Sequence, residues 1–265
     1  MSVLDPFSHP LAAVMAAAHA GLTSLGADPA SGATWLLCIA AVVVGVRLAL
    51  LPLAAYGVRL SHSSARARPH LQELTHRYRH RRDPESLRAF AVERRRIAAE
   101  HGLSRLGFLP LLVQLPIWLA LYHLLADAAA GVPVGAMNGD LVASLAAATL
   151  LGVPLAERGY LGAGAAHLVL VAGLVGTAAA LAFVTQKFLV APNTVVSDLP
   201  EAMARTQQMM PALAALGVAV AGGVVPVALL VYWVCNAVWT LGQSAVVWRW
   251  FPTPGSPAAA RARGH

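Results

Sequence analysis

Charged residues are scarce in this chain of 265 residues, where Asp, Glu, Lys and Arg together make up 12% of the sequence. A typical soluble domain contains about 25% of these residues. Hydrophobic residues make up 58%, and several uncharged runs reach the roughly 20 residues that a helix needs to cross a bilayer. The composition therefore predicts an all-α integral membrane protein and argues against a soluble domain.

Sequence patterns of catalytic, metal and nucleotide sites are missing as well. The two cysteines, Cys38 and Cys235, fall inside apolar runs, where cysteine behaves as a small apolar residue, so neither a disulfide framework nor a metal site is expected. The chain has no glycine-rich phosphate-binding loop with its lysine. No Ser/His/Asp or His/Glu spacing occurs at membrane depth. We therefore expect no cofactor, no metal ion and no enzymatic activity.

The long uncharged runs locate the expected membrane spans. Single transmembrane helices are predicted over three ranges: 34–58, 106–126 and 164–187. The uncharged run 206–248 has 43 residues, about twice the length of one span, and Gly222, Gly223 and Pro226 near its centre form a turn signal. It predicts a hairpin of two helices within 207–248, which gives a bundle of five transmembrane helices.

Five segments remain outside these spans. They are an external interfacial helix and linker at 1–33, a basic helical hairpin at 59–105, an external loop at 127–163, a cytoplasmic loop at 188–206 and a cytoplasmic tail at 249–265. Residues 11–20 faintly resemble a signal peptide, but no Lys or Arg precedes them. An interfacial helix is therefore the preferred interpretation of the N-terminal segment.

The apolar segment 141–155 is the alternative sixth span. It has 15 residues, which is short for a helix that crosses a bilayer. With five spans, 17 of the 19 Lys and Arg residues lie on one side of the membrane, whereas a sixth span would move Lys187 and Arg205 to the other side. Because basic residues are retained in the cytoplasm, we expect five spans, the N-terminus outside and the C-terminus in the cytoplasm.

Arg47 is the one charged residue within the predicted first span, 34–58. A central arginine costs roughly 2.5–3.5 kcal/mol on insertion scales, so a charge at this depth indicates a functional site. The alternative is that the side chain reaches the headgroups from a helix end. Arg47 lies more than ten residues from either end of the run, which favours the functional interpretation.

The segment 59–105 is the second unusual feature, with twelve arginines and five acidic residues. Leu71, Leu74 and Tyr78 follow a helical period, and a second helical face with Leu87, Phe90 and Ile97 comes after the break at Asp83-Pro84. The pattern predicts two antiparallel helices of about 20 residues each. Their basic faces suit anionic headgroups or ribosomal RNA, or they enforce topology and stay solvated.

Several motifs in order along the chain resemble the YidC/Oxa/Alb membrane protein insertases, in the short bacterial form with five transmembrane helices. The first span reads VRL at 46–48 and LPL at 51–53, and the hairpin reads PHLQEL at 69–74. The second span reads LPLLVQLPIW at 109–118. The last hairpin reads QQMMP at 207–211, then Pro226 and LVYWVCN at 230–236. Together the motifs cover about residues 34–248.

The resemblance implies a five-helix bundle around a polar groove that opens to the cytoplasm and to lipid and is closed outside, with Arg47 in the groove. Candidate groove residues are Arg47, Gln114, Gln186, Tyr232, Trp233 and Asn236. Buried amides also join helices to one another, and the two aromatic residues also serve as packing residues, so these alternatives stay open. Candidates for contact with clients, ribosome or lipid on the hairpin are Arg77, Arg81, Arg82, Arg94, Arg95 and Arg96.

The function implied is that of an insertase and chaperone that moves short acidic client tails across a bacterial cell membrane and releases client helices into lipid. Expected partners are newly made membrane proteins and anionic lipids, with the ribosome, the signal-recognition receptor and a Sec-type translocon as further candidates. A secondary transporter or anion-conducting protein that uses Arg47 as its substrate site is the alternative, although the internal repeats typical of transporters are not evident. Residues 104–108 (SRLGF) and Val227-Ala228 depart from the family pattern, which indicates a diverged paralogue.

Overall fold

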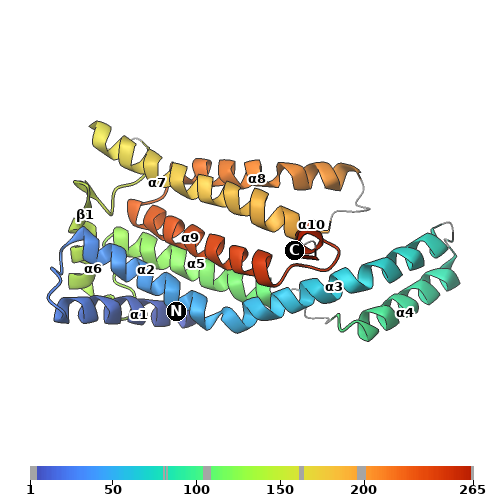
Figure 1. The fold of residues 1–265 in the computed structure, drawn as a ribbon. Helices are drawn as coiled ribbons and strands as arrows, with labels where there is room; N and C mark the ends of the chain where they lie inside the picture. Colours follow the sequence, from blue (N-terminus) through green and yellow to red (C-terminus); the bar gives the residue numbers. More distant parts are fainter. Residues whose placement is uncertain are drawn as a thin grey trace.

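The computed structural model describes residues 5–79, 81, 83–103, 109–160, 164–195 and 201–263. Long helices run side by side, and a helical hairpin projects from one end (Figure 1). Among the described residues the only strands are β1, Thr149–Leu150, and β2, Val153–Pro154, which form a short antiparallel ribbon at the opposite end. We call these two ends the hairpin end and the ribbon end. The all-α membrane architecture expected from the composition is confirmed.

Helix α1, Asp5–Ser24, lies antiparallel to α2, Gly32–Ala49 (Figure 1). It packs against α2 and α5 and contributes Leu11 and Met15 to the main core. The predicted helix in the N-terminal segment is therefore present, but it follows the length of α2 rather than standing apart from the bundle. Its place in the membrane interface stays a prediction.

The predicted first span, 34–58, is not one continuous helix. Helix α2 ends at Ala49, and α3, Leu51–Tyr78, begins after Leu50. Pro52 explains the break, because it has no N–H to donate and its ring clashes with the carbonyl four residues earlier, that of Leu48. Helix α3 then continues without interruption into the basic hairpin, so the expected boundary between 58 and 59 falls inside one helix.

The hairpin is completed by α4, Pro84–Glu100, which starts at the predicted Asp83-Pro84 break. The Asp83 side chain caps α4 by accepting a hydrogen bond from the Ser86 N–H at 2.8 Å. Leu74 and Ile97 form a small core between the two helices, separate from that of the bundle. The hairpin therefore has its own packing.

Four helices in the described part of the chain are long and apolar enough to cross a membrane: Gly32–Ala49, Leu112–Ala129, Gly164–Asn193 and Val227–Trp250. The first is α2 and the second lies in α5, Leu109–Ala129. The third is α7, Gly164–Val184, together with its π-helical extension η1, Thr185–Val190, and its 3₁₀ extension η2, Ala191–Asn193. The fourth is α9, Val227–Trp250.

The expected fourth span is α8, Glu201–Gly222, which packs along α7. Its apolar part, Gln208–Gly222, is shorter than those of the other spanning helices. The turn into α9 lies between Gly222 and Pro226. The count of five spans stays a prediction.

The segment 141–155 forms the nine-residue helix α6, Gly139–Ala147, and the β1–β2 ribbon. Neither element is long enough to cross a bilayer. Val142, Leu145 and Leu155 point into the main core, which fills the bundle from the ribbon end towards its middle. At the other end, the chain finishes in α10, Pro257–Arg263, which packs against η2 and α9.

Candidate functional site

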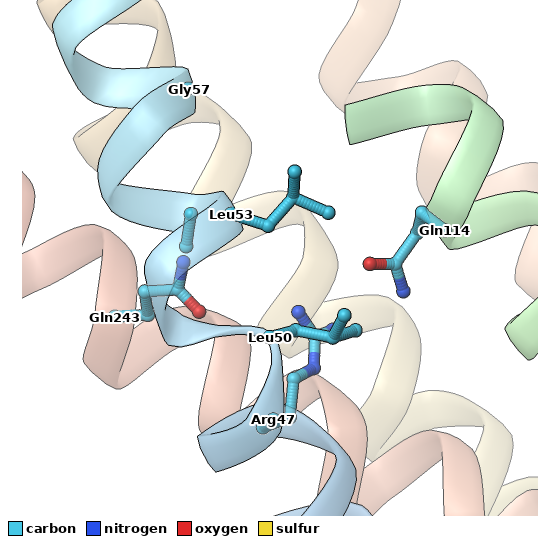
Figure 2. A pocket seen from close by; sticks show the side chains of 7 residues that line it. Arg47, Leu50, Leu53, Gly57, Gln114 and Gln243 are labelled. Atoms are coloured by element: carbon cyan, nitrogen blue, oxygen red, sulfur yellow. The ribbon is translucent and has the colours of Figure 1, made fainter. Parts of the chain in front are cut away.

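Arg47 lies in the last turn of α2, just before the helix break at Leu50. Its guanidinium enters a space bounded by α3, α5 and α9 (Figure 2). Because α3 begins in a new direction after the break, Leu50 and Leu53 line the same space as Arg47. The proline-induced break therefore places a charged side chain at a cavity halfway along the bundle.

Two residues of α9 hold the guanidinium. Arg47 donates to the Asn236 Oδ1 from Nε at 3.2 Å and from Nη2 at 2.6 Å, and Nη2 also donates to the Thr240 Oγ1 at 3.1 Å. The Thr240 hydroxyl donates to the Asn236 carbonyl at 2.7 Å, which leaves its oxygen lone pairs for Arg47. Asn236 and Thr240 are four residues apart and therefore share one face of the helix.

The charge of Arg47 has no carboxylate partner among the described residues. Only neutral dipoles support it, and Nη1 has no hydrogen-bond partner in the described part of the chain. A guanidinium donates five hydrogen bonds in a planar fork that suits a carboxylate. Arg47 is therefore oriented by the protein but not neutralised by it.

The space in front of Arg47 has a volume of about 190 Å³ and is lined by Arg47, Leu50, Leu53, Ala54, Gly57, Gln114 and Gln243. We call it the Arg47 cavity. Since a water molecule occupies about 30 Å³, it has room for roughly six waters or for a carboxylate side chain with some of them. Gln114 approaches it from α5 and Gln243 from α9 (Figure 2).

The structure brings four of the six predicted groove residues together. Arg47, Gln114, Tyr232 and Asn236 line a smaller space of about 10 Å³ that continues the Arg47 cavity towards the core. Tyr232 is only 5% exposed and closes this side. The polar cavity therefore ends at a packed layer of side chains in the direction of the ribbon end.

Two predicted groove residues lie elsewhere. Trp233 packs against the main core and lines neither the Arg47 cavity nor its small continuation, although it lies only three residues from Asn236 on α9. Gln186 lies in the π-helical segment η1 and lines neither space. Depth in the membrane was the reason for including both, but depth does not define which face of a helix is turned to the cavity.

Sequence reasoning missed Thr240 as a ligand of Arg47. The signal was available, because Thr240 lies four residues after Asn236 and so shares its helix face. Gln243 also lines the cavity, and it accepts a hydrogen bond from the Trp239 Nε1 at 3.1 Å. The kink at Pro52 was likewise readable from the sequence.

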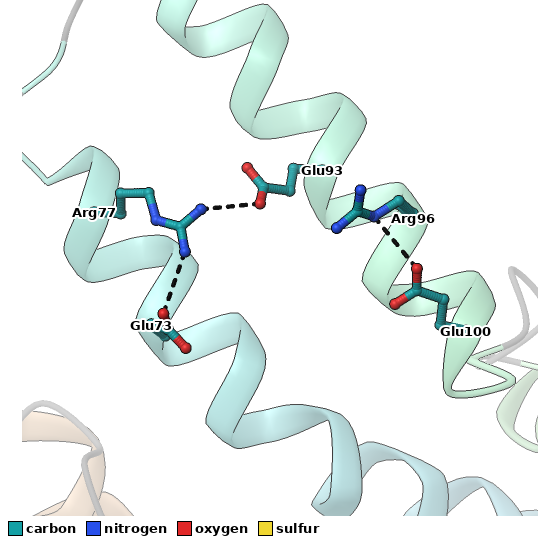
Figure 3. Close-up of polar contacts among 5 residues, drawn as sticks. All are labelled: Glu73, Arg77, Glu93, Arg96 and Glu100. Atoms are coloured by element: carbon teal, nitrogen blue, oxygen red, sulfur yellow. Dashed lines mark hydrogen bonds and ion pairs between the residues drawn. The ribbon is translucent and has the colours of Figure 1, made fainter.

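The hairpin arginines differ in how far they are neutralised (Figure 3). Arg77 pairs with Glu73 at 3.2 Å and with Glu93 at 3.1 Å, and Arg96 pairs with Glu100 at 3.3 Å. Such exposed pairs contribute about 1 kcal/mol or less each.

The other candidate arginines of the hairpin have no acidic partner in the described ranges. The Arg81 guanidinium lies over the Tyr78 ring at 5.8 Å. Arg94 and Arg95 are exposed, without an ion pair to any described residue. Arg82 lies outside the described residues. Arg94 and Arg95 are thus two of the exposed hairpin arginines that form no ion pair with a described residue, as are Arg79 and Arg88.

The ribbon end is tied together by a buried pair between Glu157 and His167. The Glu157 Oε2 and the His167 Nδ1 are 2.6 Å apart, and the His167 Nε2 lies 2.7 Å from the Gly159 carbonyl oxygen. That carbonyl only accepts, so Nε2 carries a proton and donates to it. The Val227 N–H donates to the Glu157 carbonyl at 2.8 Å, which joins the same loop to α9.

Comparisons with known proteins agree with this architecture. The family model described as "60Kd inner membrane protein" matches residues 27–254. A relative from Streptomyces avermitilis is 31% identical over 245 residues, which are 89% of this chain and 55% of the relative. A relative from Tropheryma whipplei is 26% identical over 97% of this chain and 87% of its own length, and one from Bifidobacterium longum is 23% identical over 93% and 75%.

All three relatives carry the name "Membrane protein insertase YidC". The chain spans about half the length of the Streptomyces relative and most of the Tropheryma one. These matches confirm the resemblance inferred from the motifs, and together with the apolar helices they identify a multi-pass membrane protein of bacterial type. With 27–254 covered by the family model, this chain belongs to the 60Kd inner membrane protein family, that of the YidC insertases.

Proposed function

We propose that this chain is a membrane protein insertase and chaperone that works without enzymatic chemistry. The observation that carries the proposal is Arg47, which Asn236 and Thr240 orient in a polar cavity without neutralising it. The names of the relatives favour this function over that of a secondary transporter or anion-conducting protein. The sequence departures at 104–108, which lie outside the described residues, and at Val227-Ala228 suggest a client range of its own.

The cavity suits the carboxylates of a client tail. Moving a carboxylate from water into a bilayer costs several kcal/mol, which opposes the transfer of an acidic tail. A guanidinium about 4 Å away contributes about 4 kcal/mol at an effective dielectric constant near 20. Arg47 thus provides a hydrated intermediate position halfway through the bundle, after which burial of the client's apolar helix in lipid drives release.

We propose that the hairpin end faces the cytoplasm, with the N-terminus outside and the C-terminus inside. The concentration of Lys and Arg at 59–105, 185–205 and 249–265 supports this orientation. The cavity then opens on the cytoplasmic half, and the packed ribbon end forms the outer seal. Newly made membrane proteins are the expected clients.

Arg94 and Arg95, exposed on α4, would then provide contacts for those clients, for the ribosome or for anionic lipid. The signal-recognition receptor and a Sec-type translocon remain candidate partners on this side. The family comparisons name an insertase and say nothing of these assemblies, so each is a proposal.

The direct test is complementation of a bacterial strain depleted of its own insertase. The parent chain should restore insertion of a single-span client with an acidic outer tail, whereas Arg47→Ala should lower it at least tenfold. A matched client with a neutral tail should be affected much less. Equal insertion of the two clients by Arg47→Ala would contradict the electrostatic role.

A second variant separates charge from orientation. Thr240→Val keeps the shape of the side chain but removes one acceptor for Nη2. We expect an intermediate loss for the acidic client, roughly fivefold or about 1 kcal/mol, which is less than the roughly 1.5–3 kcal/mol of a full hydrogen bond to a charged group, because Nη2 keeps its bond to the Asn236 Oδ1. Arg47→Lys should also be intermediate, because a lysine keeps the charge without the planar fork.

A further inference from the structure

A second and larger hollow lies between the first half of α3 and the second half of α9. Its volume is about 820 Å³, and Leu51, Val58, Val238, Trp239, Val246 and Phe251 are among the residues that line it. We call it the α3–α9 slot. Leu51, Val238, Val246 and Phe251 are exposed, so the slot is an open apolar surface in the described structure.

The slot begins at the helix break and ends at two basic side chains. Leu51 is the first residue of α3, and His62 lies eleven residues further on, which corresponds to about 17 Å of helix. One leaflet of the hydrocarbon core is about 15 Å thick. The slot therefore has the length of a single leaflet on the hairpin side of the membrane.

Arg59 and His62 give the hairpin end of the slot a positive mouth. Arg59 is exposed and forms no ion pair with a residue that the structure describes. The His62 Nε2 donates to the Phe251 carbonyl at 3.1 Å, which fixes the imidazole at the rim. An apolar channel with a free cation at the interface matches the two parts of an anionic phospholipid.

We propose that the α3–α9 slot binds one anionic phospholipid of the leaflet on the hairpin side, with an acyl chain along α3 and α9 and the phosphate at Arg59. The guanidinium of Arg59, unpaired among the described residues, favours a phosphate at the interface end, and the apolar lining favours an acyl chain along the two helices.

The bound lipid would lie directly beside the Arg47 cavity. Ala54 and Gln243 line both spaces, so the two lie next to each other. An acyl chain in the slot closes the Arg47 cavity between α3 and α9 with hydrocarbon. A client in the cavity is thereby left to exit on another side of the bundle. The lipid-binding proposal itself does not depend on the insertase activity.

The test is lipid retention, measured by native mass spectrometry of the full chain released from nanodiscs that contain phosphatidylglycerol and phosphatidylcholine. The parent should keep one phosphatidylglycerol. Arg59→Gln should reduce the preference for phosphatidylglycerol about fivefold, the factor that corresponds to about 1 kcal/mol for one basic residue at the surface. Arg66→Gln, seven residues further along α3 and outside the slot, should leave the preference unchanged.

Variants that fill the slot with a larger side chain provide the second arm of the test. A Cβ on Gly242 would meet no heavy atom within 4 Å, so Gly242→Leu should extend into the slot without a backbone clash. It should lower retention of both lipids at least tenfold, and Gly217→Leu on α8, equally open, should not. Ala55→Leu fills the slot from α3 and replaces Gly242→Leu if that variant does not fold.

Two results would overturn the proposal. The first is unchanged retention in Gly242→Leu or Ala55→Leu together with an unchanged lipid preference in Arg59→Gln. The second is a photoactivatable side chain at Val246 that captures a client helix and no lipid, because the occupant would then be the client.

Discussion

The two ends of the bundle are built differently, although the same helices form both. At the ribbon end, Trp35 is fully buried, and its Nε1 donates to the Ser144 Oγ at 3.1 Å, which in turn donates to the Pro29 carbonyl at 2.8 Å. At the hairpin end, the Arg47 cavity and the α3–α9 slot are open. Because the bundle is packed at the ribbon end and open at the hairpin end, the space between its helices is a groove and not a channel.

The physical reason lies in where the chain turns. At the ribbon end the turns fold back into the bundle, and their backbone groups bond to one another, as in the Ala228 N–H to the Leu155 carbonyl at 2.9 Å. Buried backbone groups near lipid require such partners. At the hairpin end α3 leaves the bundle instead of turning back, and the α3–α9 slot stays open between α3 and α9. The difference predicts that substitutions at the two ends have different effects.

Gly32→Ala should have the largest effect on stability. A Cβ at Gly32 would collide with the Thr149 carbonyl oxygen in the ribbon. Overpacking against backbone costs about 3 kcal/mol at the upper end of the usual range, so we expect a lower midpoint of thermal unfolding in detergent. Gly57→Ala is the matched control at the open end, where the Cβ would meet nothing within 4 Å. Equal midpoints for the two variants would show that the ends do not differ in packing.

His167→Leu should cost about 2 kcal/mol, because it leaves the partly buried Glu157 carboxylate without its partner. Thermal unfolding measures the loss, and His123→Leu at an exposed position is the control. Glu157→Gln should be milder, since the amide keeps the size of the side chain and can donate to the Nδ1. A larger loss in Glu157→Gln than in His167→Leu would show that the charge of Glu157, and not its contact with His167, stabilises the ribbon end.

Arg77→Gln should have a smaller effect, below about 1 kcal/mol, because both of its ion pairs are exposed. Hydrogen exchange of the amides in α3 and α4 should increase in the hairpin alone, while the ribbon end stays protected. Arg95→Gln, whose side chain forms no ion pair with a described residue, should leave exchange unchanged. Increased exchange at the ribbon end would show that the two regions are coupled.

Lowering the pH should have the smallest effect on stability, and we expect that effect at the start of α4. The Ser86 N–H and hydroxyl hydrogen-bond the Asp83 carboxylate and lower its pKa below the ordinary value. The cap therefore stabilises the hairpin fully above about pH 4, the pKa of an aspartate in the unfolded chain. This stabilisation is lost as the pH falls through the lowered pKa of Asp83 in the folded chain. The protection factor of the Ser86 amide against hydrogen exchange should fall at that pH in the parent. It should stay constant in Asp83→Asn, because asparagine caps the helix without titrating.

Arg47 and the hairpin show how much could be read in advance. The insertion cost of one arginine in an uncharged run was enough to predict Arg47 as a site residue, and the structure places it at a cavity. Heptad-like spacing and Asp83-Pro84 were enough to predict two packed helices, because both signals are local. Depth in the membrane suggested all the groove candidates, and Trp233 shares one motif with Asn236, but Trp233 and Gln186 do not line the Arg47 cavity or its continuation.

By itself, the sequence determined the all-α membrane architecture and the family, since these follow from composition and motif order, and it predicted Arg47 as a site residue from the cost of one charge in lipid. Only the tertiary structure decided that Thr240 joins Asn236 in supporting Arg47 and that an apolar slot lies beside the cavity between α3 and α9. These features depend on how faces from distant helices meet. Local patterns fix the period of a helix but not its rotation against its neighbours.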